Sequence, residues 1–100
     1  MRSGVGEGNF TLIGRWERID AEGDILADVF NSDGTGQLLW YGESSSSGIG
    51  FIWSVSGGRL YRECLFWGGH FVNGFTITNG DTTLYIYRSW WRRTAYTRVN

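Results

Sequence analysis

The chain of 100 residues has no proline and no lysine, and it contains one cysteine, one histidine and one methionine. A single cysteine rules out a disulfide within the chain. One cysteine and one histidine do not make up the common ligand sets of zinc. Without proline, the turns have to be made by glycine, asparagine, aspartate and serine. We therefore expect no disulfide framework, no metal site and no cofactor.

Long apolar runs are missing as well. No run reaches the ~18 residues that a membrane span needs, so no membrane partner is expected. The start of the chain, MRSGVGEGNF, lacks the apolar segment of a signal peptide. We expect residues 1–9 to be a flexible leader and residues 10–100 to form one domain. A cytoplasmic location is the expectation, although a secreted protein that has lost its signal peptide would have the same sequence.

Positive charge is scarce overall but concentrated late in the chain. The formal net charge is -1, and all nine basic residues are arginine. Residues 87–98, YRSWWRRTAYTR, interleave aromatic and basic side chains as nucleic-acid-binding surfaces do. A dedicated nucleic-acid-binding domain is usually basic as a whole. The overall charge therefore argues against a nucleic-acid partner.

Strand signals dominate the residues that are present. Short β-branched and aromatic runs alternate with clusters of glycine, asparagine, aspartate and serine, and no segment keeps a 3.6-residue period long enough for a helix. The pattern predicts eight strands, at residues 11–20, 25–30, 37–42, 50–55, 60–67, 71–78, 83–88 and 92–99. Short connections predict antiparallel neighbours. The expected fold is all-β, an eight-stranded antiparallel up-and-down barrel, with a β-sandwich as the alternative.

The turns of such a meander fall at two unlike ends. One end receives tight-turn sequences at residues 31–36, 56–58 and 79–81. The other receives residues 21–24, 43–48, 67–70 and 89–91, which are more varied and include the histidine and three tryptophans. Because binding residues concentrate on varied loops, we expect the second end to meet a ligand.

Strand alternation separates an inner from an outer face. The apolar residues expected to face inward are Trp16, Phe30, Leu38, Trp40, Phe51, Trp53, Val55, Leu60, Phe66, Phe75, Ile77, Leu84 and Ile86. The same alternation turns Arg18, Asp28, Arg62, Asn73, Arg88 and Arg92 inward. On the outer wall it places Leu39, Tyr41, Ile52, Tyr61, Leu65, Trp67, Val72, Tyr85 and Tyr87. A contiguous apolar patch of this kind marks an interface, so we expect a homodimer through it.

Three residues carry a resemblance to a known family. The first strand contains Gly14-Arg15-Trp16, and Arg98 lies near the end of the last strand. This pattern resembles the lipocalin and wider calycin superfamily, and residues 30–36, 53–60 and 75–81 look like small bacterial lipocalin-like domains. The resemblance implies an eight-stranded barrel in which the tryptophan plugs the closed end and the arginine packs across it. Gly14, Trp16 and Arg98 would then be structural.

The function expected from this reading is the binding of a small hydrophobic or amphipathic molecule in the open end of the barrel. Aromatic walls supply apolar area, and inward arginines would favour an anionic head such as a carboxylate. The candidate ligand-binding residues are Arg18, Trp40, Phe51, His70, Phe71, Arg88, Trp90 and Arg92. A barrel filled by its own side chains, with no cavity, is the alternative.

Two further functions stay open. The first is a barrel-type cyclase or isomerase that acts on a flexible hydrophobic substrate, with His70 or an inward arginine as helper. The sequence predicts no catalytic set, since no serine–histidine–aspartate arrangement is indicated and Cys64 is expected to be buried. A binding role is therefore preferred to an enzyme. The second is a protein-interaction module, such as an inhibitor or accessory subunit, with a filled barrel.

Overall fold

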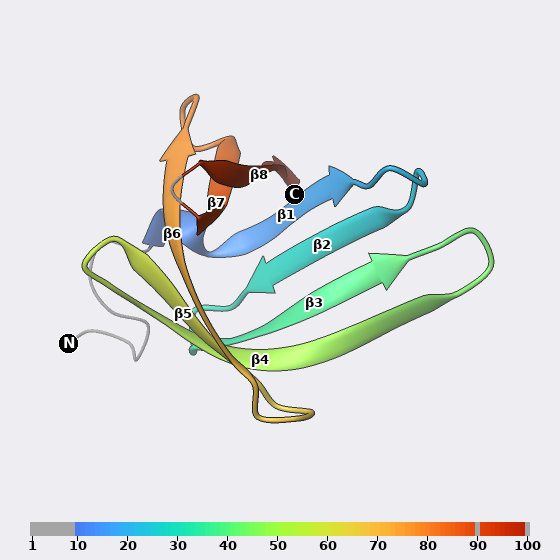
Figure 1. Cartoon of the computed structure of the whole chain (residues 1–100), viewed down its shortest axis with the longest axis horizontal. Coiled ribbons are helices and arrows are strands. Elements are labelled where there is room, and N and C mark those ends of the chain that lie inside the picture. The colour runs from blue at the N-terminus through green and yellow to red at the C-terminus, as the bar shows by residue number, and fades with distance from the viewer. Residues whose placement is uncertain (1–9, 90, 100) are drawn as a thin grey trace.

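The computed structural model describes residues 10–89 and 91–99, and they form a closed barrel of eight antiparallel strands (Figure 1). A short 3₁₀ helix, Phe10–Leu12, comes before the first strand. The strands are β1 (Gly14–Ile19), β2 (Ile25–Phe30), β3 (Thr35–Tyr41), β4 (Ser46–Ser56), β5 (Arg59–Cys64), β6 (His70–Thr78), β7 (Thr83–Ser89) and β8 (Arg92–Val99). Each strand pairs with the next, and β8 pairs with β1. The expected barrel is confirmed, whereas the expected leader at residues 1–9 lies outside the described residues.

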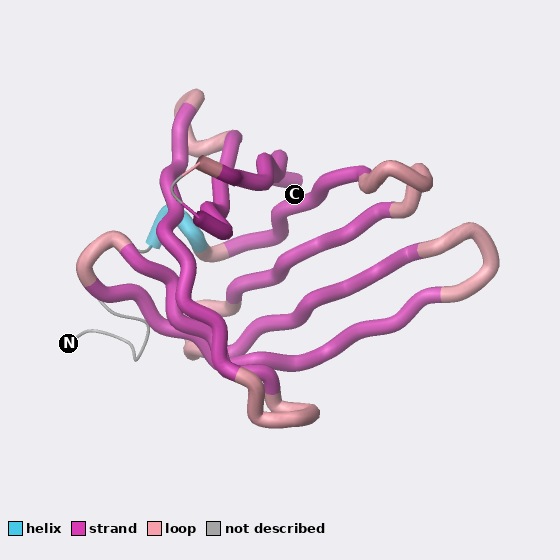
Figure 2. Tube along the Cα trace, in the orientation of Figure 1, coloured by secondary structure: helices cyan, strands magenta, loops and turns pink. Residues whose placement is uncertain are grey.

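The barrel is tightly closed at one end and flared at the other. β8 meets β1 only along Arg15, Trp16 and Glu17, and β5 meets β4 only from Phe51 onward. The four strands β1 to β4 therefore continue as a sheet beyond the closed ring, and this sheet stretches to the right in Figures 1 and 2. The closed end holds the tight turns predicted between β2 and β3, β4 and β5, and β6 and β7. The flared end is the one with the more varied connections.

Most strand boundaries lie within two residues of those predicted, and three differ by more. The first strand was predicted from residue 11, but Phe10–Leu12 form a 3₁₀ helix and β1 begins at Gly14. The other two are the end of β5 and the start of β4.

β5 ends at Cys64 because the chain turns there, with Gly68 donating to the Cys64 carbonyl at 2.8 Å and Cys64 donating to that of Gly69 at 2.8 Å. The inward orientation predicted for Phe66 is wrong, since this side chain is 85% exposed on the turn. The serine run, expected to be a loop, begins β4 instead. Gly42 donates to the Ser45 carbonyl at 2.8 Å, which makes a tight hairpin and places Ser46 in the strand.

The core fills the closed half of the barrel. Its fully buried large side chains include Trp16, Phe30 and Phe51, and Phe30 makes edge-to-face contacts with Phe51 and Trp53 at centroid distances of 5.5 and 5.1 Å. Leu38, Phe75 and Ile77 pack against this cluster as partly buried side chains. Apart from Phe66, the apolar residues predicted to face inward are buried or partly buried, whereas Arg88 and Arg92 of the polar inward set are exposed.

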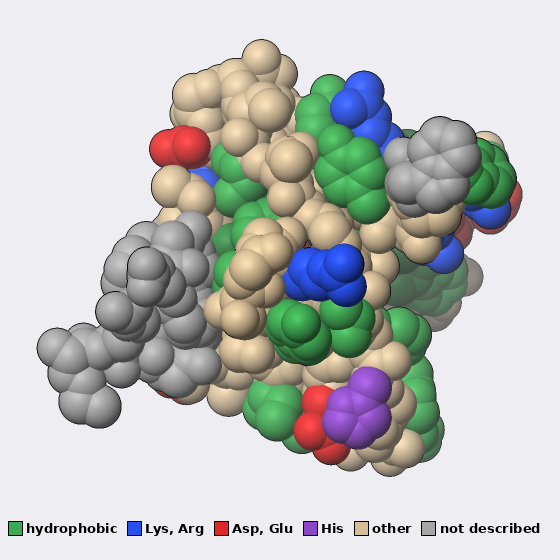
Figure 3. Space-filling model, turned by 60° about the vertical axis from the view of Figure 1, so that its left-hand side comes forward, with side chains coloured by type: hydrophobic (Ala, Val, Ile, Leu, Met, Phe, Trp, Pro, Cys, Tyr) green, Lys and Arg blue, Asp and Glu red, His purple; other side chains and the backbone are tan. Residues whose placement is uncertain are grey.

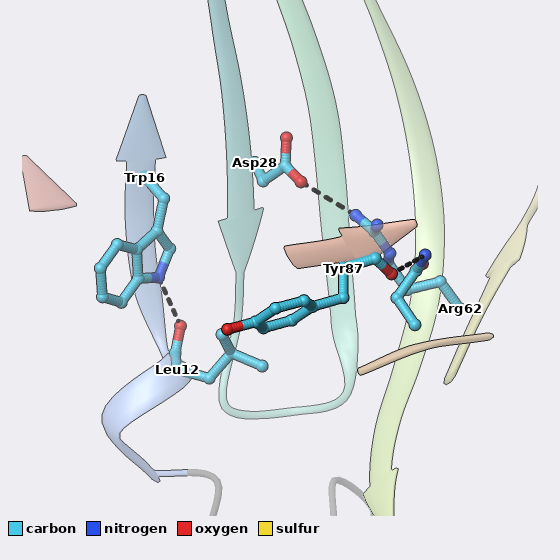
Figure 4. Close-up of polar contacts among 6 residues, drawn as sticks. Leu12, Trp16, Asp28, Arg62 and Tyr87 are labelled. Atoms are coloured by element: carbon cyan, nitrogen blue, oxygen red, sulfur yellow. Dashed lines mark hydrogen bonds and ion pairs between the residues drawn. The ribbon is translucent and has the colours of Figure 1, made fainter. Parts of the chain in front are cut away.

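Arg98 fastens the closed end. The Trp16 indole donates to the Leu12 carbonyl at 2.9 Å (Figure 4), and the Arg98 guanidinium lies 4.2 Å from the centre of the Trp16 ring. Arg98 also donates to the carbonyls of Ile13 at 2.9 Å, Asp81 at 2.7 Å and Thr11. Gly14 leaves room for this arginine, because a Cβ there would lie 2.8 Å from Arg98 Nη1. The contact expected between Arg98 and Trp16 is thus present.

Candidate functional site

A cavity of about 210 Å³ lies inside the barrel, between the buried core and the flared end. Strands β2 through β8 all contribute to its lining. The apolar part of the lining consists of Leu38, Phe51, Cys64, Phe71 and Ile86, and the polar part of Asp28, Arg62, Asn73, Arg88, Thr94 and Tyr96. Apolar walls with a few convergent polar groups are typical of a small-molecule site.

A buried ion pair crosses the cavity from β2 to β5. Arg62 Nη1 donates to Asp28 Oδ2 at 2.9 Å, with the two side chains only 11% and 6% exposed (Figure 4). The Arg62 guanidinium also lies over the rings of Phe51 and Phe30, at 5.5 and 6.0 Å from their centres. Burial raises the pKa of Asp28, and the neighbouring charges of Arg62 and Arg18 oppose that rise without cancelling it. Asp28 is thus a carboxyl group that takes up a proton more readily than an exposed aspartate.

Arg18 approaches the same region from β1. Its guanidinium lies 5.8 Å from the centre of the Tyr96 ring, and Tyr96 lines the cavity. Burial, with the nearby charge of Asp28, raises the pKa of the Tyr96 hydroxyl, which therefore stays protonated as a hydrogen-bond donor. Among the described residues, the Nε atoms of Arg18 and Arg62 are buried without a hydrogen-bond partner. Buried donors of this kind call for an acceptor.

Arg88 adds a third positive charge at the mouth of the cavity. Its side chain lines the cavity and is exposed. Two guanidinium groups, those of Arg62 and Arg88, therefore line the cavity together with one carboxylate, that of Asp28, and Arg18 adds a further positive charge at the border. Nearby, Asn73 Nδ2 donates to the Tyr87 carbonyl at 3.1 Å, which fixes the asparagine in the wall. The arrangement favours an anionic group next to an apolar surface.

The structure brings together only part of the predicted ligand-binding set. Phe51, Phe71 and Arg88 line the cavity, and Arg18 reaches its border through Tyr96. Three others lie elsewhere: Trp40 donates to Asp24 Oδ2 at 3.1 Å in the flared sheet, His70 is on the outer wall, and exposed Arg92 lies 5.5 Å from the Trp91 ring. Trp90 lies outside the described residues.

The set also missed several groups. Asp28, Arg62 and Asn73, which alternation predicts to face inward, line the cavity although the predicted ligand-binding set does not include them, and so do Thr94 and Tyr96. Alternation along β8 could have indicated Thr94 and Tyr96, because they lie on the same face of the strand as Arg92, which is predicted to face inward.

A second depression, of about 400 Å³, lies on the outer face of β4, β5 and β6. Ile52, Tyr61 and Val72 form its apolar floor, and the register partners Glu63 and His70 stand at one side. Figure 3 shows this face, where acidic and histidine side chains adjoin hydrophobic ones. Exposed apolar side chains were expected on this wall.

Within residues 10–89 and 91–99, no group of three or more histidine, cysteine, aspartate or glutamate side chains is placed to hold a metal ion. The described part of the chain also has no helix that is long and apolar enough to cross a membrane.

Comparison with known proteins gives one informative likeness. No family model matches the chain, and no curated protein matches it. Among solved structures, the chain is similar to the NMR structure of a protein from Bacteroides thetaiotaomicron VPI-5482, with a TM-score of 0.73 and 21% sequence identity over 100% of this chain and 98% of that chain. At this level of identity the likeness shows a shared fold, and the two chains share it over nearly their whole lengths.

Proposed function

We propose that the protein binds a small amphipathic molecule with an anionic head, such as a carboxylate, inside the barrel. The observation that carries the proposal is the largely apolar cavity whose lining holds two guanidinium groups, those of Arg62 and Arg88, but a single carboxylate, with Arg18 at its border. The clasp of Arg98 on Trp16, next to Gly14, supports placing the chain among lipocalin-like barrels. Barrels of eight strands have room for one small ligand.

In this proposal each part of the ligand contacts a different wall of the cavity. The apolar part lies against Phe51, Phe71 and Ile86, and the anionic head lies between Arg88 and the Tyr96 hydroxyl. A second anion near Asp28 would repel its carboxylate, and burial raises the pKa of Asp28, which makes this carboxyl group easier to protonate than an exposed aspartate. Arg62, whose buried Nε has no hydrogen-bond partner, is a donor for the ligand.

The volume limits the size of the ligand. Sites for drug-sized ligands measure roughly 300–1,000 Å³, whereas this cavity measures about 210 Å³. A short aliphatic or single-ring carboxylic acid suits it better than a long lipid. Binding is also better supported than catalysis, because His70, the one histidine, lies on the outer wall rather than at the cavity.

A titration followed by NMR tests the proposal. Hexanoate and benzoate are added to the labelled protein, and their uncharged amides serve as matched probes. We expect the acids to shift the amide signals of Phe51, Arg62 and Phe71, and to bind at least about tenfold more tightly than the amides, the factor that 1.4 kcal/mol of charge recognition provides. Equal affinity for acids and amides, or no shifts at these residues, would contradict the proposed anion site.

Two arginine variants locate the charge that matters. Arg88→Gln removes a positive charge from the cavity mouth and should weaken binding of the acids without changing that of the amides. Arg93→Gln is the matched control, because Arg93 is exposed and lies over Tyr85, 4.0 Å from its ring centre, on the outside of the barrel. If both variants weaken binding of the acids equally, the affinity depends on the overall charge of the protein and not on a charge at the cavity, which would contradict the proposal.

A further inference from the structure

Residues 46–50 of β4 have one paired side and one open side. β4 pairs with β3 from Ser46 onward, but its pairing with β5 begins only at Phe51. In an antiparallel ladder, every second residue directs its N–H and C=O groups toward the neighbouring strand. Ser45 does so, since its carbonyl accepts from Gly42. Ser46 and Gly48 therefore direct their N–H and C=O groups away from β3, Ser46 being adjacent to Ser45 and Gly48 two residues further on. Within the described part of the chain, the ladder gives these two residues no partner on that side.

This edge lacks the usual protection against pairing with another strand. Natural edge strands carry charges, prolines or bulges that prevent such contacts. Residues 44–50, with the sequence SSSSGIG, contain neither charge nor proline, and the pairing of β3 with β4 runs without a shift in register. The hairpin of β3 and β4 also reaches well beyond β5, so its edge is accessible (Figures 1 and 2).

We propose that this edge pairs with the same edge of a second copy of the chain, antiparallel and about a twofold axis at Ser47. Ser46 of each copy then faces Gly48 of the other, which forms about four backbone hydrogen bonds. A twofold interface must be self-complementary. The segment meets this condition, because uncharged residues face uncharged residues and Gly48 has no side chain to obstruct the approach.

The turn after β5 gives this arrangement an apolar contact. Leu65, Phe66 and Trp67 are exposed there, and Leu65 lies next to the edge, with its Cδ1 atom 3.4 Å from where a Cβ on Gly50 would be. In the proposed register the hairpin turn of the second copy, which contains Ser44, is directed toward Gly50. The hairpin tip of each copy thus covers the exposed apolar turn of the other. Leu65 and Trp67, two of the outer-wall residues expected in a homodimer contact, lie in this interface.

Sedimentation velocity of the full chain over a range of concentrations tests the proposal. We expect a species of about twice the chain mass of 11.3 kDa. Ser46→Pro removes an outward N–H that folding of the monomer does not use, and it should weaken dimerisation at least about tenfold. Ser46→Thr keeps that N–H and should remain dimeric. A wild-type chain that stays monomeric at all concentrations overturns the proposal.

A cysteine crosslink tests the register without relying on the folding of the proline variant. The two Ser47 residues face each other at the axis, so Ser47→Cys should form a disulfide-linked dimer on mild oxidation. Ser45→Cys is the control, because the same register holds its two copies about 14 Å apart. Cys64 is buried and contributes no accessible thiol. Crosslinking of Ser45→Cys but not of Ser47→Cys, or a dimer that persists in Ser46→Pro, overturns the proposed edge. None of these measurements depends on ligand binding.

Discussion

The Trp16 side chain is completely buried, and its indole N–H donates to the Leu12 carbonyl. It closes one end of the barrel. Replacing such a side chain with alanine removes its apolar contacts and leaves a cavity. Trp16→Ala should lower the free energy of unfolding by about 3–5 kcal/mol, measured by urea denaturation. Trp91→Ala is the control, because Trp91 is 65% exposed and its loss should change stability by less than about 0.5 kcal/mol. Similar losses in both variants would contradict the role assigned to Trp16.

Asp28 makes the stability of the fold depend on pH. Its folded-state pKa is raised above the ordinary value of 3.8, mainly by burial. A raised folded pKa means that the folded state holds the proton more tightly, so this contribution to stability is fully present below 3.8 and is lost as the pH rises through the folded pKa. Wild type should therefore lose stability relative to Asp28→Asn as the pH rises from 3.8. Urea denaturation of both proteins at several pH values measures this difference, and parallel pH profiles would contradict it.

At individual positions, alternation predicted the inward face well and the site less well. Phe51, Phe71 and Arg88 reach the cavity as the sequence suggested. Trp40 shares the inward parity, but it lies in the flared part of the sheet and donates to Asp24 instead. His70 was chosen for its chemistry, although its parity along β6 is that of outer-wall Val72. Parity states which face a residue occupies, whereas the depth along the barrel follows only from the register of all the strands.

Arg98 connects three elements, and its loss should affect them together. From β8 it donates to carbonyls before β1 and to that of Asp81 in the turn between β6 and β7. Hydrogen bonds to a charged group contribute about 1.5–3 kcal/mol each, so Arg98→Ala should destabilise the fold by at least about 2 kcal/mol in urea denaturation. Arg98→Lys should restore little, because an ammonium group lacks the planar fork. Full recovery with lysine would show that the charge alone suffices.

The elements themselves were largely predictable from turn chemistry. Glycines mark the tight turns, and Gly34, Gly57 and Gly58 adopt the positive φ values that such turns need, at 90°, 59° and 75°. The serine run misled the prediction because serine is common in loops, whereas the pairing of β3 with β4 extends the strand through it. β5 was predicted too long because residues 65–67 are apolar, but the positive φ of Gly68, at 71°, turns the chain there.

At the scale of the whole molecule, the residues that fasten the fold and the cavity proposed to bind a ligand lie at different levels of the barrel. The Trp16 clasp lies at the closed end, while the cavity, with Arg62 and Arg88, lies toward the flare. Short connections and two unlike sets of turns were enough to predict an antiparallel barrel. The cavity was not predictable in the same way, because it depends on how Phe51, Arg62 and Tyr96 from distant strands come to one level. Likewise, the open edge of β4 appears only when two neighbouring strands have unequal lengths in the fold.

Ligand binding should therefore be visible as a rise in the melting temperature of the whole barrel, since a ligand that binds only the folded state stabilises it by mass action. At a concentration one hundred times Kd the gain is about 2.7 kcal/mol, which for a domain of this size raises Tm by about 10–20 °C. His70→Ala should show the same rise with benzoate or hexanoate, because His70 lies on the outer wall. Arg88→Gln should require a higher concentration of the acid for an equal rise, because a positive charge at the cavity mouth is lost. The measurement is the melting temperature of wild type, His70→Ala and Arg88→Gln at increasing concentrations of each acid. If the rise in Tm disappears in His70→Ala but is unchanged in Arg88→Gln, the acid binds in the outer depression and not in the cavity.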